Sequence, residues 1–157
     1  MKKIKQKTYS LSSAKTMVAK WKGLNQNIVF TNGCFDIFHY GHLHLLYNSK
    51  KLGDKLVIGL NDDDSIKKIK GKNRPVHNQK QRLFMLSSIR FVDLVILFSE
   101  RTPIKIIQTL RPDVLTKGAD YSLNQVVGGR EVIESGGEVV LIPLINNLSS
   151  SSLITKI

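Results

Sequence analysis

A chain of 157 residues, 41% hydrophobic and 23% charged, is long enough for one well-packed domain and short for two. Its 24 basic and 12 acidic residues give a formal net charge of +12, which favours anionic partners such as phosphorylated metabolites or nucleic acid. No apolar run approaches the length that spans a bilayer, and the single cysteine, Cys34, excludes an internal disulfide framework. We therefore expect a cytoplasmic protein without a membrane partner.

Strand-like and helix-like segments alternate along the chain. Apolar runs typical of buried strands lie at residues 28–30, 56–60, 92–98, 114–115 and 139–142. Helical spacing of apolar residues is found between them, at residues 43–47, 83–89, 103–110 and 129–135. Thr102 is expected to cap a helix that begins at Pro103, and the Gly136-Gly137 pair to end the last of these helices.

This alternation predicts the α/β class: a single domain with a Rossmann-like open parallel sheet and helices on both faces. Residues 1–26, with a helix around residues 14–21, are expected to form an N-terminal helical extension packed on the main domain, residues 27–157. In such sheets ligands bind beyond the carboxyl ends of the strands. Asn61-Asp62-Asp63 and Lys117-Gly118 follow two of the predicted strands, and we expect Asp62 and Asp63 to cap the next helix.

The stretch FTNGCFDIFHYGHLHLL, residues 30–46, joins the first strand of this sheet to a helix. His39 and His42 are three residues apart, so they project from one face of the first helical turn, and Gly41 lets a ligand approach closely. A helix amino end attracts phosphate through its free N–H groups. These features together suit the stabilisation of negative charge that develops on a phosphoryl group.

Two other interpretations of the histidines stay open. They could be a structural pair satisfied by local hydrogen bonds, or they could bind a metal with Cys34 or Asp36. A closed zinc site needs four well-placed ligands, and no CxxC or second histidine pair is present, so we expect no protein-bound metal. Cys34 itself is expected to be a small buried thiol rather than a nucleophile.

The stretch TNGCFDIFHYGHLHLL resembles the signature of the HxGH nucleotidyltransferase superfamily. LNDDDSIKKIKGKNRPVHNQKQRLFML, DVLTKGADYS, VGGREVIESGGEVVLIP and SSSSLITKI follow in the order typical of the adenylyltransferases of ADP-heptose synthesis. The resemblance implies that residues 27–157 are a nucleotidyltransferase domain. The implied reaction, part of lipopolysaccharide core precursor synthesis, converts ATP and D-glycero-β-D-manno-heptose 1-phosphate to ADP-heptose and pyrophosphate.

The resemblance also implies a set of site residues. His39 and His42 would be catalytic and would stabilise the pentavalent α-phosphate. The implied nucleotide- and phosphate-binding residues are Cys34, Phe35, Gly41, Lys70, Arg82, Lys117, Gly118, Asp120, Ser149, Ser150 and Ser151. The serines would form a second phosphate cradle, although a plain helix cap needs only one of them. The roles of Lys72, Arg74 and Arg90 stay open.

We expect Mg²⁺ to be held by the phosphates rather than by a protein cage. The expected partners are ATP and a sugar phosphate made by a separate heptose kinase polypeptide, since 157 residues leave no room for a kinase domain. The chain departs from the family at Ser151, usually threonine, at Ala119, often glycine, and at Phe38 and Tyr40, which are bulkier.

Two alternative functions follow from other features. Residues 89–93 resemble a motif of glycerol-3-phosphate cytidylyltransferases, so transfer of CMP to glycerol 3-phosphate or another polyol phosphate is the enzymatic alternative. The net charge makes a basic nucleic-acid-binding domain the non-enzyme alternative. We expect no nucleic-acid partner, because basic residues cluster only mildly and are not interleaved with aromatics. Homo-oligomerisation is left open.

Overall fold

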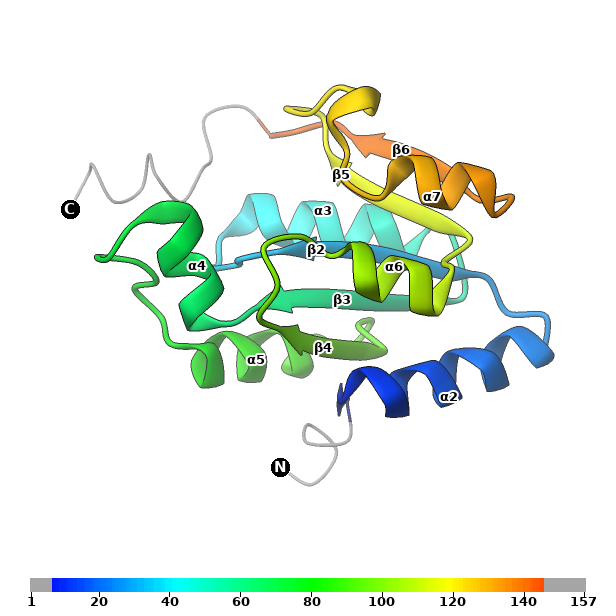
Figure 1. Ribbon diagram of the computed structural model, residues 1–157, viewed down its shortest axis with the longest axis horizontal. Coiled ribbons are helices and arrows are strands. Elements are labelled where there is room, and N and C mark those ends of the chain that lie inside the picture. The colour runs from blue at the N-terminus through cyan, green and yellow to red at the C-terminus, as the bar shows by residue number, and fades with distance from the viewer. Residues whose placement is uncertain (1–6, 146–157) are drawn as a thin grey trace.

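The computed structural model describes residues 7–145, which form six strands and the helices that connect them (Figure 1). The strands are β1 (Thr8–Tyr9), β2 (Ile28–Gly33), β3 (Lys55–Asn61), β4 (Leu94–Phe98), β5 (Val114–Gly118) and β6 (Glu138–Ile142). The helices are α2 (Leu11–Gly23), α3 (Tyr40–Lys50), α4 (Asp63–Lys70), α5 (Gln79–Ser88), α6 (Ile104–Leu110) and α7 (Gly129–Glu134), with a 3₁₀ turn η1 (Leu123–Gln125).

All six strands are parallel and lie in the order β1-β4-β3-β2-β5-β6. The chain runs outward from β2 through β3 to β4 and then returns to the other side of β2 to form β5 and β6. The strand order therefore reverses between β2 and β5, where the connections leave the sheet in opposite directions. A crevice at the carboxyl ends of these two strands is the expected ligand site of such a sheet.

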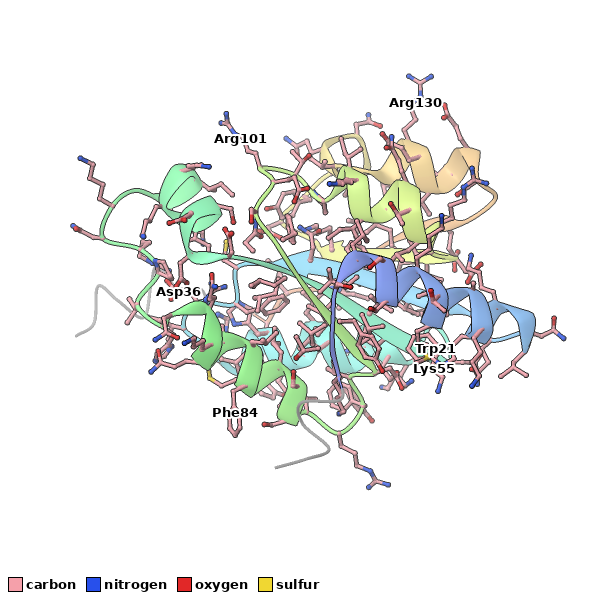
Figure 2. The ribbon with its side chains drawn as sticks, turned by 60° about the horizontal axis from the view of Figure 1, so that its bottom comes forward. Trp21, Asp36, Lys55, Phe84, Arg101 and Arg130 are labelled. Atoms are coloured by element: carbon pink, nitrogen blue, oxygen red, sulfur yellow. The ribbon has the colours of Figure 1, made fainter. Side chains whose placement is uncertain are left out.

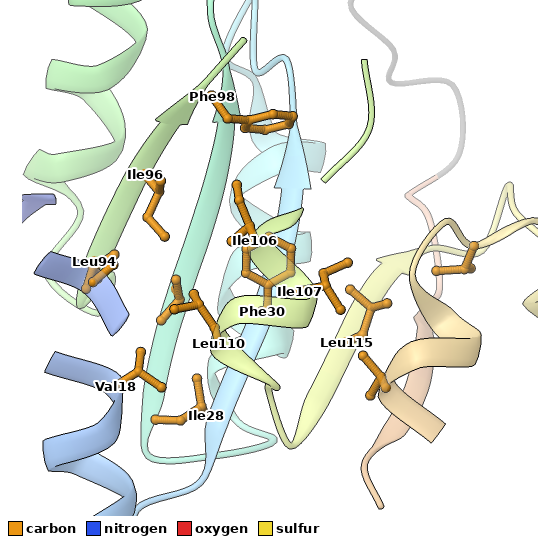
Figure 3. Packing of buried hydrophobic residues seen from close by; sticks show 14 residues of the cluster. Val18, Ile28, Phe30, Leu94, Ile96, Phe98, Ile106, Ile107, Leu110 and Leu115 are labelled. Atoms are coloured by element: carbon orange, nitrogen blue, oxygen red, sulfur yellow. The ribbon is translucent and has the colours of Figure 1, made fainter. Parts of the chain in front are cut away.

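Helices cover both faces of the sheet, and each face has its own hydrophobic core. On one face, α2 and α6 pack with Phe30 of β2 and Ile96 of β4, as Figure 3 shows for Val18, Ile107 and Leu110. On the other face, α3 and α5 contribute Leu46 and Leu86 to a second cluster with Ile58 of β3. Strands apolar on both faces are buried in this arrangement, which confirms the predicted fold class.

The strand predictions agree with the structure, because each predicted apolar run lies within or overlaps one of β2 to β6. Two short elements were not predicted: β1, which adds to the sheet beside β4, and η1. Neither element has enough residues to show a period in the sequence. The predicted division of the chain at residue 26 stays a prediction, although α2 packs its Ala14 and Val18 into the core.

The helix boundaries show two correct predictions and two wrong ones. As predicted, the Gly136-Gly137 pair ends α7: both backbone N–H groups donate to carbonyls of its last turn, and Gly136 has a φ of +87°. Asp62 caps α4 by accepting a hydrogen bond from the backbone N–H of Ser65 at 2.7 Å. Asp63 is instead the first helical residue. The helix expected to begin at Pro103 begins at Ile104, with Pro103 itself as the N-cap and no side-chain cap, because Thr102 lies one residue too early. Within residues 7–145, no helix is both long and apolar enough to cross a membrane.

Candidate functional site

A pocket of about 460 Å³ opens at the carboxyl ends of the strands, across the point where the strand order reverses. Most of the predicted site residues line it. These are Cys34, Phe35, His39, Gly41, His42, Lys70, Lys117, Gly118 and Asp120. They come from the connections after β2, β3 and β5, so residues up to 86 positions apart in the sequence meet in one cavity because the strands are parallel.

The two histidines lie at the start of α3, where His39 is the N-cap and His42 is the third helical residue. Nδ1 of His39 accepts a hydrogen bond from the backbone N–H of Gly41 at 3.1 Å. Nδ1 of His42 accepts from the backbone N–H of His39 at 3.4 Å. The expected local hydrogen bonds are thus present, but they use only one nitrogen of each ring. Among residues 7–145, Nε2 of neither ring has a hydrogen-bond partner.

The surroundings of His42 are aromatic. Its ring lies 3.9 Å from that of His39, 5.6 Å from that of Phe38 and 5.2 Å from that of Phe35, measured between centroids. Burial is the main cause that lowers the pKa of His42 to about 3, and the nearby His39 and Lys70 act in the same direction. Burial also lowers the pKa of His39. Both rings are therefore neutral at pH 7.

Phe35 holds the loop between β2 and α3 in an unusual conformation. Its φ of +47° is in the left-handed region, which costs a residue with a side chain about 1–2 kcal/mol. Its ring is only 3% exposed and lies against Gly33, where a Cβ would be 3.2 Å from the ring. Burial of this ring compensates for the backbone strain and fixes the loop beside the histidines.

Asp36, labelled in Figure 2, anchors the same loop. Its side chain is fully buried, and its carboxylate pairs with the guanidinium of Arg74. It also accepts hydrogen bonds from the backbone N–H groups of Val76 and His77, at 2.8 and 3.0 Å. The open role of Arg74 is thereby assigned: it neutralises a buried carboxylate and ties the segment between α4 and α5 to the histidine loop.

Arg82 is not where the prediction placed it, since it does not line the pocket. Its side chain is fully buried, and its guanidinium donates to the backbone carbonyls of Cys34 and Asn61 at 2.7 Å each. It also donates to the carbonyl of His77 at 2.9 Å and pairs with the carboxylate of Asp63 at 2.9 Å. With these donors used within the protein, Arg82 holds three connections together, and its predicted contact with phosphate stays a prediction.

Lys70 and Lys117 bring positive charge to opposite walls of the pocket. Lys70 is the last residue of α4 and is exposed. Lys117, at the end of β5, donates to the backbone carbonyl of Asn32 at 2.8 Å, and burial lowers its pKa to about 8. Its ammonium is therefore charged at pH 7 but uses only one acceptor among the described residues, which leaves donor capacity for an anionic ligand.

Gly118 and Asp120 shape the wall beside Lys117. A Cβ at Gly118 would lie 2.7 Å from a carboxylate oxygen of Asp120 and 2.8 Å from Leu144, so a larger residue there would require these two side chains to move. Asp120 is exposed on the pocket surface. Cys34 also lines the pocket, and burial raises the pKa of its thiol, so it is protonated at pH 7. This protonation state disfavours a nucleophilic role.

Several predicted or open residues lie elsewhere. Ser149, Ser150 and Ser151 lie outside the described residues. Lys72 does not line the pocket. Arg90 precedes β4, at the opposite end of the sheet from the pocket, so within this chain it does not contact a ligand bound there. Its position gives no support to the polyol-phosphate alternative.

The sequence prediction missed several residues of the pocket. Asn32 is the last residue but one of β2, while Arg101 and Thr102 follow β4. The rule that ligands bind beyond the carboxyl ends of parallel strands would have pointed to all three. Tyr121, Gln125 and Leu144 also line the pocket, but they lie in loops or in the short η1 turn, which carry no periodic signal in the sequence.

The donor chemistry of the pocket is that of an anion site. Among the described residues, no group of three or more histidine, cysteine or acidic side chains is arranged to hold a metal ion. The carboxylate of Asp36 is already paired, while the histidines and lysines offer N–H donors. Such an arrangement can bind a polyphosphate and stabilise charge on a reacting phosphoryl group.

Comparisons with known proteins agree with this chemistry. Residues 30–156 match the model of the family described as cytidylyltransferase-like. The bifunctional protein HldE of Azorhizobium caulinodans is 47% identical over 147 residues, which is 94% of this chain and 31% of the relative. HldE of Campylobacter fetus is 50% identical over 132 residues, 84% of this chain and 28% of the relative. The chain thus spans about 30% of the length of these curated relatives.

A solved structure is also similar. The lipopolysaccharide core biosynthesis protein from Thermoplasma volcanium matches with a TM-score of 0.62 and 32% sequence identity. The match covers 76% of this chain and 97% of the other. These comparisons favour an enzyme over the nucleic-acid-binding domain that the net charge alone left open.

Proposed function

The chain belongs to the cytidylyltransferase-like family and is a nucleotidyltransferase, and from this premise we propose that it transfers AMP from ATP to D-glycero-β-D-manno-heptose 1-phosphate. The products would be ADP-heptose and pyrophosphate. At the coarser level, the family and the relatives support a nucleotidyltransferase that acts on sugar phosphates.

The observation that carries the proposal is the meeting of His39, His42, Lys70 and Lys117 around one pocket at the switch in strand order. Two neutral N–H donors and two ammonium groups surround a space that ATP and an acceptor phosphate can share. An ionised sugar phosphate is already a nucleophile, so the reaction needs positioning and charge stabilisation rather than a general base.

In the proposed reaction, an oxygen of the sugar phosphate attacks the α-phosphorus of ATP. The bond from the α-phosphorus to the oxygen that bridges it to the β-phosphate breaks, and pyrophosphate leaves with that electron pair. The histidines would donate hydrogen bonds to the α-phosphoryl oxygens, on which negative charge grows. Lys70 and Lys117 would neutralise the phosphates on either side of the reacting α-phosphorus.

Two findings support the heptose as acceptor. The motifs KGADY, residues 117–121, and GGREV, residues 128–132, resemble those of heptose 1-phosphate adenylyltransferases. The curated relatives are HldE proteins, and the similar solved structure is a lipopolysaccharide core biosynthesis protein. We propose that a kinase activity supplies the sugar 1-phosphate, since a sugar acquires that group by phosphoryl transfer.

We also propose that Mg²⁺ accompanies the triphosphate. When bound, it would neutralise phosphate charge while keeping most of its water. The residues present fit this role, because Asp120 offers an exposed carboxylate on the pocket wall to the water shell of the ion. Among residues 7–145 no closed cage of protein ligands competes with the phosphates.

The test is to measure pyrophosphate release with heptose 1-phosphate and each of the four nucleoside triphosphates. We expect turnover with ATP and the heptose, and its loss in His42→Ala. The second candidate substrate pair is CTP as donor with glycerol 3-phosphate as acceptor. The cytidylyltransferase-like family description favours it, and it is assayed in parallel. Turnover with that pair, but not with ATP and the heptose, would overturn the substrate proposal and leave nucleotidyl transfer intact.

A further inference from the structure

The backbone determines which nitrogen of each imidazole carries the proton. Nδ1 of His39 accepts the N–H of Gly41, and Nδ1 of His42 accepts the N–H of His39. A ring nitrogen that accepts a hydrogen bond carries no proton, so a neutral imidazole in this position has its proton on Nε2. Both histidines can therefore donate only through Nε2, the nitrogen without a partner among residues 7–145.

The charges around His42 disfavour a second proton on its ring. The rings of His39 and His42 are stacked at 29° with centroids 3.9 Å apart, so two imidazolium ions would repel each other. Lys70 of α4 adds positive charge near His42. The carboxylate of Asp36 would stabilise a protonated His42, but its negative charge is already neutralised by the guanidinium of Arg74. An imidazolium at His42 would thus be poorly compensated.

Phe38 adds an apolar surface to the same ring. It stacks on His42 at an interplanar angle of 25° and a centroid distance of 5.6 Å, while Phe35 is tilted against the ring at 57°. Phe38 is partly buried and packs against the core cluster that contains Phe35 and Leu46. A ring held in this way keeps water from His42 and restrains the orientation of its Nε2–H.

Building on the proposed nucleotidyl transfer, we propose that Phe38 is a positioning residue that holds His42 as a neutral, Nε2-protonated hydrogen-bond donor to the phosphoryl oxygens. The positive charge of the pocket then comes from Lys70 and Lys117 rather than from the histidine. The pKa of His42, lowered to about 3 mainly by burial, agrees with this assignment. Because the lysines supply the positive charge, His42 can donate the same hydrogen bond at pH values at which an ordinary imidazole changes its charge.

The first test reads the protonation state directly in the protein without substrate. Long-range proton–nitrogen NMR spectra of protein with ¹⁵N-labelled histidine are recorded from pH 5 to pH 8, and His42→Gln assigns the signal. We expect the pattern of a neutral ring with its proton on Nε2 throughout this range. An imidazolium pattern at pH 6, or a proton on Nδ1, would overturn the proposal without reference to activity.

The second test uses Phe38→Leu, with Phe38→Tyr as the conservative variant and Phe84→Leu as a matched control. Phe84 projects from α5 and is 54% exposed, so its loss leaves the pocket unchanged (Figure 2). Rates relative to wild type are compared at each pH, because this ratio cancels the titration of the substrate phosphates. We expect Phe38→Leu to lower kcat roughly tenfold at pH 7.5, as for other misplaced catalytic groups.

The dependence on pH separates positioning from general damage to the fold. In Phe38→Leu the relative rate should fall further below pH 6.5, as water reaches His42 and allows it to protonate, whereas Phe38→Tyr should stay close to wild type. A relative rate that is independent of pH would overturn the role of Phe38. Absence of transfer in the wild type with every substrate pair would instead refute the proposed function, while the NMR test would still decide the state of His42.

Discussion

The two walls of the pocket are built differently. The histidine wall, residues 33–42, is fixed by buried groups: Asp36 is 1% exposed, and Arg82 behind it is fully buried. The opposite wall, residues 118–127, is largely exposed, with Tyr121 at 44% and Val127 at 41%. Its η1 turn carries a local capping box between Ser122 and Gln125, and Val126, which follows the turn, is the residue of this wall that reaches the core.

This difference indicates a division of function between the walls. Groups that stabilise a transition state must be held in place before the substrate binds, and a buried, hydrogen-bonded loop provides that rigidity. Groups that only select the substrate can rearrange on binding, as exposed loops commonly do. We therefore expect mutations in the histidine wall to lower kcat, and mutations in the opposite wall to change KM.

The largest effect is expected for His42→Ala, which removes a donor from the rigid wall. By analogy with the loss of one oxyanion-stabilising donor, kcat should fall by about 100- to 1000-fold. The melting temperature should fall only by the amount expected from lost ring packing with Phe35 and Phe38, because among the described residues the ring makes one weak backbone hydrogen bond of 3.4 Å. Steady-state kinetics and thermal unfolding measure the two quantities. A fall of less than tenfold in kcat would remove His42 from the mechanism.

The next effect concerns the support of the rigid wall. Arg82→Met leaves three backbone carbonyls and the Asp63 carboxylate without their donor, so the free energy of unfolding should fall by about 3 kcal/mol. The control is Arg130→Met, since Arg130 is exposed and its ion pair with Glu134 is one helical turn away (Figure 2). We expect no measurable loss there in urea titrations. Equal stability of both variants would contradict the structural role of Arg82.

A smaller effect is expected from the pH dependence of Lys117, the β5 residue that directly precedes the opposite wall. Burial lowers its pKa to about 8, so in the free enzyme the ammonium is charged below that pH and loses its charge above it. Because the charged form would bind the triphosphate, kcat/KM for ATP should fall with rising pH, approaching about tenfold per pH unit well above pH 8. Lys117→Arg should remove this alkaline limb, since an arginine stays charged. Identical profiles in the variant and the wild type would exclude Lys117 as its origin.

The smallest effect is expected for Tyr121→Ala. Its ring centroid lies 5.7 Å from Nζ of Lys117, a contact worth about 0.5–1 kcal/mol at an exposed site. The KM for ATP should therefore rise by about two- to fivefold with kcat almost unchanged. Tyr121→Phe retains the ring and serves as the control. A large drop in kcat in Tyr121→Ala would show that the two walls do not divide their functions in this way.

The sequence predicted the architecture because the strands are apolar on both faces. The runs of β2 to β6 could be located from hydrophobicity alone, and parallel pairing followed from their alternation with helices. The histidine pair was also visible, since its spacing and the neighbouring Gly41 are local features. By contrast, β1 depends on its pairing with β4 and was missed. The start of α6 was misplaced by one residue, because Pro103 rather than Thr102 is its N-cap.

The strands and the histidine motif could be located from the amino-acid sequence alone, because each is encoded in residues that lie close together along the chain. Three features became visible only in the folded protein: Arg82 is buried behind the pocket, Asp36 pairs with Arg74, and Tyr121 lies beside Lys117. The physical reason is that the role of a charge depends on its burial and on its partners. Here those partners lie up to 48 positions away in the sequence and meet only when the parallel strands align their carboxyl ends.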